Sequence, residues 1–200
     1  MKTWTRKKRW VIRLIIGGLI LSVLGGVGVF AIALFNPFHA HEHCMKSAGM
    51  SLMLYAGDHG GKFPFHTNGF GDALLLMLDE SREDTRLYTA PGDDGTLLKE
   101  CLKSKADVPE SRCTRSYVQG LTDTNNPEIA LLFDRYPTRG GDHFRRPWGP
   151  KLRDVWLLGG GMEVIPEKRW ANFRNKQIEL LIAEGISRRE AEAYYEPPQP

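Results

Sequence analysis

The sequence predicts an α+β fold in which an N-terminal transmembrane helix precedes a helix packed on a small antiparallel sheet, with further helices at the C-terminus. Three observations indicate this order. Residues 14–35 form an uncharged apolar run. Apolar residues then recur every three or four positions from Met45 to Ala56, as on a helix with one buried face. Short apolar segments follow, and three glycines at 159–161 interrupt the last of them, which indicates a hairpin.

The apolar run is long enough for a membrane span. As a helix rising ~1.5 Å per residue it would extend ~33 Å, and the hydrocarbon layer is ~30 Å thick. The residues before it include six cations and no acid, which predicts a cytoplasmic N-terminus. We therefore expect a single-pass protein of the inner membrane. Its expected parts are a basic cytoplasmic segment over 1–13, the span over 14–35, an extracytoplasmic domain over 36–196 and a tail over 197–200.

Two further features lie in this N-terminal part. Ala31 and Ala33 are spaced like a signal-peptide cleavage site, so a cleaved signal peptide is the alternative to a retained anchor. Gly18, Ser22 and Gly26 recur every four residues, which puts three small side chains on one stripe of the helix. Such a stripe allows a second helix to approach closely, so we expect self-association or partner packing there, although glycine is also common in membrane helices.

The charge balance argues against a nucleic-acid partner. The chain has 27 Lys and Arg and 24 Asp and Glu. Subtracting the six N-terminal cations from 27 leaves 21 basic residues against 24 acidic ones in the remainder. Because nucleic-acid binding requires a basic surface on the folded domain, no nucleic-acid partner is expected.

The stretch HAHEHC at 39–44 is rich in groups that bind metals. On a helix His39 and His43 share one face, with Glu42 beside them, which is the chemistry of a zinc site if another ligand arrives. Without such a ligand these side chains are a hydrated collar just outside the membrane. Since no CxxC or HExxH spacing supports the metal site, we favour the hydrated collar and keep a metal-binding module as the alternative function.

Three cysteines, Cys44, Cys101 and Cys113, follow the predicted span. An extracytoplasmic compartment lets disulfides persist, and an odd count leaves one thiol unpaired. We favour a disulfide between Cys101 and Cys113, which would close a short loop, although three pairings are possible on paper.

The remaining elements are predicted from periodicity and turn chemistry. Residues 70–80 have the apolar density of a short helix, and 81–115 are polar and turn-rich. A C-terminal helix ends at Gly185, and Ser187 with Glu190 forms a capping box for one more helix. Strands are predicted over the following segments: 116–120, 129–134, 154–158 and 162–165.

The segment CMKSAGMSLMLYAGDHGGKFP (44–64) resembles the region after the membrane helix in bacterial prepilin-like proteins, a group that includes the type II secretion pseudopilins. SYVQGLTDTNNPEIALLFDR and DVWLLGGGMEVI are similar to their later strands and final hairpin. The residues that match the first motif are Tyr55, Ala56, Asp58, Gly61, Phe63 and Pro64.

This resemblance implies a pilin-like fold and a non-catalytic protein that acts by interaction with envelope or secretion components. It also implies possible calcium binding, since some major pseudopilins bind calcium in a loop of the sheet. Asp123, Asn125 and Glu128, with Asn126, offer oxygen ligands of the right kind. The chain departs from the family in two respects. Residues 1–41 contain no acid, so the prepilin peptidase signature is absent, and the hairpin has Gly159 and Gly161 where the family's Asp and His would stand.

The sequence carries no recognised catalytic motif. It contains no G-x-S-x-G, no P-loop and no dinucleotide-binding fingerprint. Asp134 or Asp142 with His143 could form an acid–base couple, but His143 lies in a Gly- and Arg-rich stretch where a solvated histidine is the default. We therefore expect a protein that is not an enzyme.

Overall fold

The computed structural model describes residues 15–18, 21–22, 25–26, 44–81, 84–90, 93–139 and 149–196. The chain divides into two compact units, Met1–Asn36 and Pro37–Pro200, which are considered separately. The predicted segments 1–13 and 197–200 lie outside the described residues.

The predicted localisation requires a correction. In the described part of the chain, no helix combines the length and the hydrophobicity needed to cross a membrane. This finding contradicts the single-pass membrane protein that the run 14–35 predicts. A span needs about 20 consecutive apolar residues, and only short helical pieces of this run are described. Gly18, Ser22 and Gly26 belong to these pieces and are helical and exposed, and their packing against a second helix stays a prediction.

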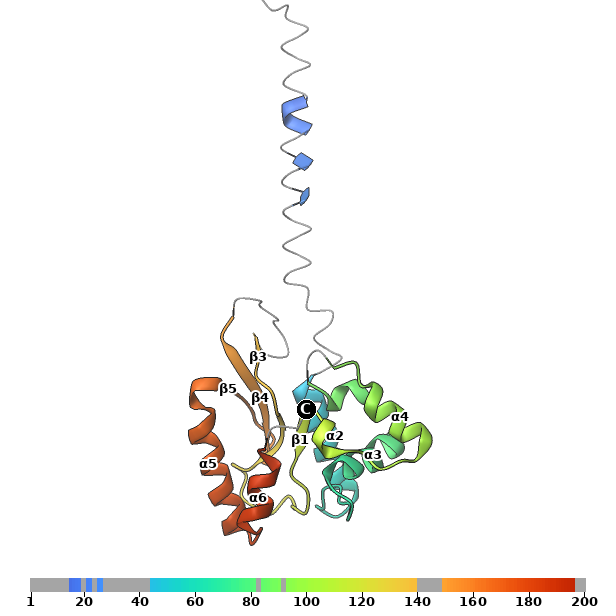
Figure 1. The fold of residues 1–200 in the computed structure, drawn as a ribbon, viewed down its shortest axis with the longest axis vertical. Helices are drawn as coiled ribbons and strands as arrows, with labels where there is room; N and C mark the ends of the chain where they lie inside the picture. The colour runs from blue at the N-terminus through green and yellow to red at the C-terminus, as the bar shows by residue number, and fades with distance from the viewer. Residues whose placement is uncertain are drawn as a thin grey trace, which may run out of the picture. The chain divides into compact units, whose positions relative to one another are not determined.

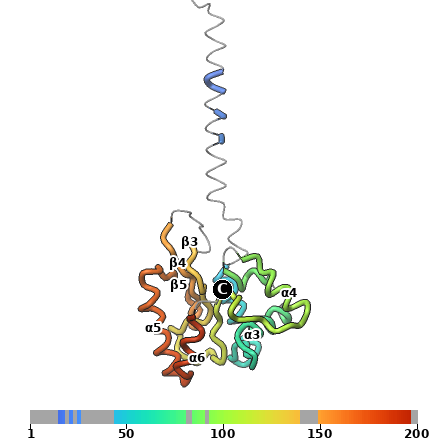
Figure 2. The backbone as a smooth tube through the Cα atoms, viewed as in Figure 1, coloured from blue at the N-terminus to red at the C-terminus, as the bar shows by residue number. Residues whose placement is uncertain are grey.

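The second unit has three layers (Figure 1). One side of a central sheet carries α2 (Met45–Asp58), α3 (Phe70–Ser81) and α4 (Thr96–Ser104), and the other carries α5 (Glu167–Ala183) and α6 (Arg188–Tyr194). Figure 2 shows in the backbone alone that α3 and α4 lie on the side away from α5. Two short 3₁₀ helices connect these elements: η2 (Thr85–Tyr88) and η3 (Glu110–Arg112).

The sheet is antiparallel throughout. Its central strand, β4, pairs with β2 and β3 along one edge and with β5 along the other, and β1 pairs with β2. The strands are β1 (Arg115–Tyr117), β2 (Ala130–Asp134), β3 (Thr138–Arg139), β4 (Lys151–Leu157) and β5 (Met162–Pro166). The predicted α+β class with a small antiparallel sheet is thus confirmed.

Most predicted elements are present, with shifted ends. The predicted hairpin is confirmed: Leu157 donates to the Gly161 carbonyl at 2.7 Å, and Gly160 has φ +79°. Gly160 therefore takes the left-handed position of a three-residue hairpin loop. The elements that were not predicted are β3, α4 and the two 3₁₀ helices. The helix α4 lies inside the stretch interpreted as turns, although Leu98, Cys101 and Leu102 have the spacing of one helix face and would have indicated it.

Helix α2 packs on the sheet through the predicted apolar stripe, which is confirmed. Its buried residues are Met45, Ala48, Gly49, Leu52 and Ala56. Gly49 faces the indole of Trp156 on β4, and a Cβ at this position would lie 2.1 Å from the ring. The absence of a side chain at Gly49 therefore sets how closely the helix approaches the sheet.

The opposite face of the sheet is covered by aromatic residues of the C-terminal helices. Phe133 of β2 stacks on Tyr195 with ring centroids 4.5 Å apart and meets Trp170 of α5 at 5.8 Å. The predicted cap of α6 is confirmed, since the Ser187 hydroxyl accepts the Glu190 N–H. Ser116 of β1 donates to the Tyr194 carbonyl at 2.6 Å, which fastens the end of α6 to the sheet.

Candidate functional site

A buried ion pair crosses the sheet at the start of β1. Arg115 and Asp134 are register partners on β1 and β2, and Arg115 Nε lies 2.9 Å from Asp134 Oδ1 with both side chains fully buried. The second oxygen of Asp134 accepts the Asp154 N–H of β4 at 3.3 Å. Arg115 also donates to the Leu87 carbonyl of η2. Because buried charges are tolerated only when paired, this group holds three strands and η2 in one arrangement.

Asp134 is one of the two acids that the sequence offered as a partner for His143. Its carboxylate is bound by Arg115 inside the sheet, and both side chains are fully buried. Asp142 and His143 lie outside the described residues. Sequence reasoning missed the ion pair because the predicted first strand began one residue after Arg115.

A second charged cluster joins β4 to α5. Arg153 Nε lies 2.9 Å from Glu167 Oε2, and its terminal nitrogen lies 3.1 Å from Oε1, so the contact is bidentate. The same guanidinium lies 4.4 Å from the Trp170 ring centroid, a cation–π distance. The hydrogen bond from Arg153 lowers the pKa of Glu167 below its usual value. Both contacts fix the first turn of α5 to the sheet.

The predicted calcium ligands make contacts with other parts of the protein in this structure. Asn125 Oδ1 accepts the Thr122 N–H at 2.6 Å, and Asn125 Nδ2 donates to Glu184 Oε2 at 2.6 Å. Glu128 binds Lys176 at 2.8 Å. The Asp123 carboxylate instead lies over the backbone of Gly61.

Calcium binding by Asp123, Asn125 and Glu128 therefore stays a prediction. These side chains serve the loop and α5, since Glu184 of α5 also accepts the Asn126 N–H at 2.8 Å. Within the described ranges, no group of three or more His, Cys, Asp or Glu side chains is arranged to hold a metal ion. The predicted zinc ligands His39, Glu42 and His43 lie outside those ranges.

The three cysteines are free and buried, so the predicted Cys101–Cys113 disulfide is not formed in this structure. Both thiols contact the segment between them. Cys101 Sγ lies 3.7 Å from the Asp107 carbonyl oxygen, and Cys113 Sγ lies 4.0 Å from that of Pro109. Burial raises the pKa of Cys101, and it raises the pKa of Cys113 to about 12. In this state both sulfurs are protonated and weakly nucleophilic near neutral pH.

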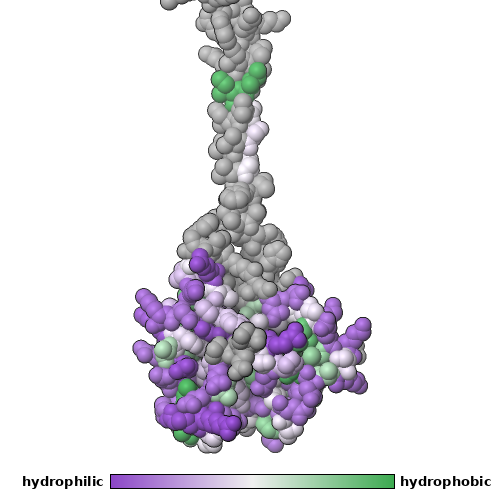
Figure 3. All heavy atoms as spheres, viewed as in Figure 1, coloured by the Kyte–Doolittle hydropathy of each residue, from purple (hydrophilic) through white to green (hydrophobic). Residues whose placement is uncertain are grey.

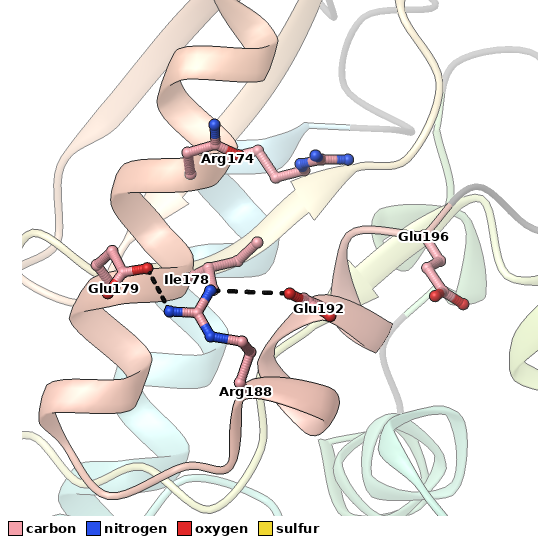
Figure 4. A pocket seen from close by; sticks show the side chains of 7 residues that line it. Arg174, Ile178, Glu179, Arg188, Glu192 and Glu196 are labelled. Carbon is pink, nitrogen blue, oxygen red and sulfur yellow. Dashed lines mark hydrogen bonds and ion pairs between the residues drawn. The ribbon is translucent and has the colours of Figure 1, made fainter.

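A polar groove of about 440 Å³ lies between α5 and α6 (Figure 4). Arg188 binds Glu179 at 2.7 Å and approaches Glu192 at 3.8 Å. The positive charge of Arg188 is therefore offset by carboxylates of the same groove. Exposed pairs of this kind contribute little to stability, because water screens their charges. The groove is lined by Arg174, Asn175, Ile178, Glu179, Arg188, Glu192 and Glu196.

The outward face of α2 carries exposed apolar side chains. Met50 is 50% exposed and Leu54 is 69% exposed, and their spacing of four residues puts them on one face, opposite the residues that contact the sheet. We call this pair the α2 stripe. Other exposed large apolar side chains of the second unit are Phe65, Leu76, Tyr136 and Val164. The face of this unit shown in Figure 3 is mainly hydrophilic with small, separated apolar spots. The sequence signal for this stripe is the spacing of four residues between Met50 and Leu54, which lie outside the apolar pattern of the buried face.

Comparison with known proteins adds no relative: no family model, no curated protein and no solved structure matches this chain.

Proposed function

We propose that this chain is a non-catalytic interaction protein with a pilin-like fold, which resembles the type II secretion pseudopilins and acts by contacting envelope or secretion components. The observation that carries the proposal is the α2 stripe. A helix that buries one face against the sheet also presents Met50 and Leu54 to the surroundings, half or more exposed. Exposed apolar groups on an otherwise polar surface are typical of protein interaction sites.

The inner face of α2 gives further support. Gly49 rests directly on Trp156, so the helix packs closely on the sheet behind its outer face. A preorganised surface loses little conformational entropy when a partner binds. The charged groups near the sheet are engaged with one another, as in Arg115 with Asp134 and Arg153 with Glu167, which favours structural roles for them.

Site-specific photocrosslinking in intact cells tests the proposal. A photoreactive benzoylphenylalanine replaces Leu54 in the full-length chain, and the captured proteins are identified by mass spectrometry. We expect adducts with envelope or secretion proteins, and we expect Met50→Asp in the same chain to reduce their yield at least about tenfold, because it places a charge in an apolar contact.

The matched control places the same photoreactive residue at Arg169, an exposed position of α5 on the other side of the sheet. We expect few adducts there. Equal capture from both positions, or no adduct from Leu54, would contradict an interaction through the α2 stripe.

A further inference from the structure

The strand β5 has a free edge. Its partner β4 lies along one edge, and no described strand pairs with the other. The register pairs Trp156 with Met162 and Asp154 with Val164, without a bulge. Val164 is 47% exposed although it belongs to a strand. Exposed strand edges are sites at which another chain adds a strand.

The hairpin geometry decides which backbone groups this edge presents. Leu157 donates to the Gly161 carbonyl, so the Leu157–Gly161 pair is hydrogen-bonded. In an antiparallel ladder hydrogen-bonded and non-hydrogen-bonded pairs alternate, so the pairs of β4 with Met162 and with Val164 are of the second kind. The N–H and C=O groups of Met162 and Val164 therefore point away from β4, together with the C=O of Pro166.

The side chains of β5 differ between the two faces of the sheet. Met162 and Val164 are on the face of Trp156, which α2 packs against, whereas Glu163 is on the face of α5. Glu163 is exposed and is the only charged residue of the strand. Its basic neighbour Lys176 is already bound to Glu128 at 2.8 Å. An added strand would therefore meet apolar contacts on one face and a carboxylate on the other.

A second copy of this chain fits the edge poorly. Antiparallel self-pairing about Val164 would place the two Glu163 carboxylates on the same face as diagonal neighbours, about 7–8 Å apart, where like charges repel. Pro166 has no N–H, so it could return no hydrogen bond to Met162 of the other copy. The charge of Glu163 and the missing N–H of Pro166 therefore both favour a partner segment with a different sequence.

We propose that the free edge of β5 binds an extended segment of a partner protein in which apolar residues alternate with lysine or arginine. The segment pairs with the backbone of Met162 and Val164, its apolar side chains lie beside Val164, and its cations face Glu163. This inference deepens the proposed function by naming a second surface and the chemistry of its partner.

The test uses the purified full-length chain and a blocked, fluorescein-labelled heptapeptide of alternating valine and lysine. We expect a saturable rise in fluorescence anisotropy. A matched peptide of alternating valine and glutamate should bind at least about tenfold more weakly, since one favourable charge contact is replaced by repulsion. A valine–lysine peptide with alternate backbone nitrogens methylated should not bind, because it cannot form the ladder.

Two variants locate the binding at β5. Val164→Pro removes an N–H that the β4 ladder does not use, so the fold is retained and the affinity falls at least about tenfold. Val164→Thr keeps the N–H and serves as its control. Glu163→Lys should reverse the preference between the two peptides, and this result does not depend on how well the proline variant folds.

Three results would overturn the inference: no saturable binding, equal binding of the methylated peptide, or binding unchanged in both Val164→Pro and Glu163→Lys. Dimerisation that is lost in Val164→Pro would point instead to a second copy as the occupant. Failure here leaves the crosslinks from Leu54 unaffected, so it can be told apart from failure of the proposed function.

Discussion

Gly49 controls the contact between α2 and the sheet. An alanine Cβ at this position would lie 2.1–2.3 Å from atoms of the Trp156 indole, well inside van der Waals contact. The indole is itself buried among core residues, so it has little room to move. The helix would have to shift away from β4 to admit a methyl group.

We therefore predict that Gly49→Ala lowers the free energy of unfolding by about 1–3 kcal/mol, the usual cost of overpacking a core. Gly57→Ala is the matched control on the same helix, because a Cβ there meets nothing within 4 Å. It should stabilise the protein by about 0.4–1 kcal/mol, because alanine lowers the conformational entropy of the unfolded chain. Urea unfolding measures both, and equal effects would show that the close contact is unimportant.

At the scale of elements, the N-terminus of α3 and the segment before β1 cap each other. Asp72 of α3 accepts the Val108 N–H at 2.7 Å, and Glu110 of η3 accepts the Phe70 N–H at the start of α3. Each carboxylate thus satisfies a backbone donor on the other element. His66 lies 3.7 Å from Asp72 at the same junction.

Glu110 should make stability depend on pH. Burial raises the pKa of Glu110 above its ordinary value of 4.5, although the Phe70 hydrogen bond and Arg135 oppose this. The folded state therefore binds the proton more tightly than the unfolded state. Its contribution to stability is fully present below pH 4.5 and is lost as the pH rises through the raised pKa.

Glu110→Gln removes this titration and keeps a hydrogen-bond acceptor. We expect the free energy of unfolding of the wild type, measured relative to the variant, to be largest in acid and to decrease as the pH rises toward neutrality. Urea denaturation of both proteins across this range measures the difference. A difference that increases with pH would contradict the assignment.

The predicted Cys101–Cys113 disulfide also belongs to this junction, since the two thiols flank the segment that carries Val108 and Glu110. Their raised pKa values predict slow oxidation, because the thiolate is the reactive form. With glutathione disulfide as oxidant at alkaline pH, we expect one intramolecular disulfide and two reduced glutathiones. Alkylation after unfolding should then label Cys44 alone. Stable glutathione adducts on Cys101 or Cys113 would contradict the pairing.

At the scale of the whole molecule, one hydrophobic core joins both layers of helices to the sheet. It includes Leu52 of α2 and Phe133 of the sheet, and it extends to Trp170 and Tyr194 on the other side. Because β2 and β4 contribute to both faces, neither layer of helices is independent of the other.

Residues 44–196 should therefore unfold as one cooperative unit. We predict that peptides from α2 and α5 lose hydrogen-exchange protection with the same free energy of opening in the full-length chain, as expected when only global unfolding exposes them. Mass spectrometry at increasing denaturant measures both. Earlier loss of protection in α5 alone would show that the C-terminal helices open separately.

The sequence by itself determined the elements whose signals are local. The buried stripe of α2, the left-handed Gly160 in the hairpin and the Ser187 cap of α6 each depend on residues a few positions apart, so they could be predicted without a fold. Only the tertiary structure decided the contacts between residues distant in the chain. The hydrogen bond from Asn125 to Glu184, 59 residues later in the chain, is an example.

The contact of Gly49 with Trp156 and the ion pair of Arg115 with Asp134 also join residues that are distant in the chain. Their roles depend on partners that lie on other strands or helices. The free edge of β5 can be identified only from the strand register, which shows which backbone groups point away from β4. Local periodicity encodes secondary structure because it reflects neighbours along the chain, whereas the ion pairs and the exposed surfaces depend on which elements the fold brings together.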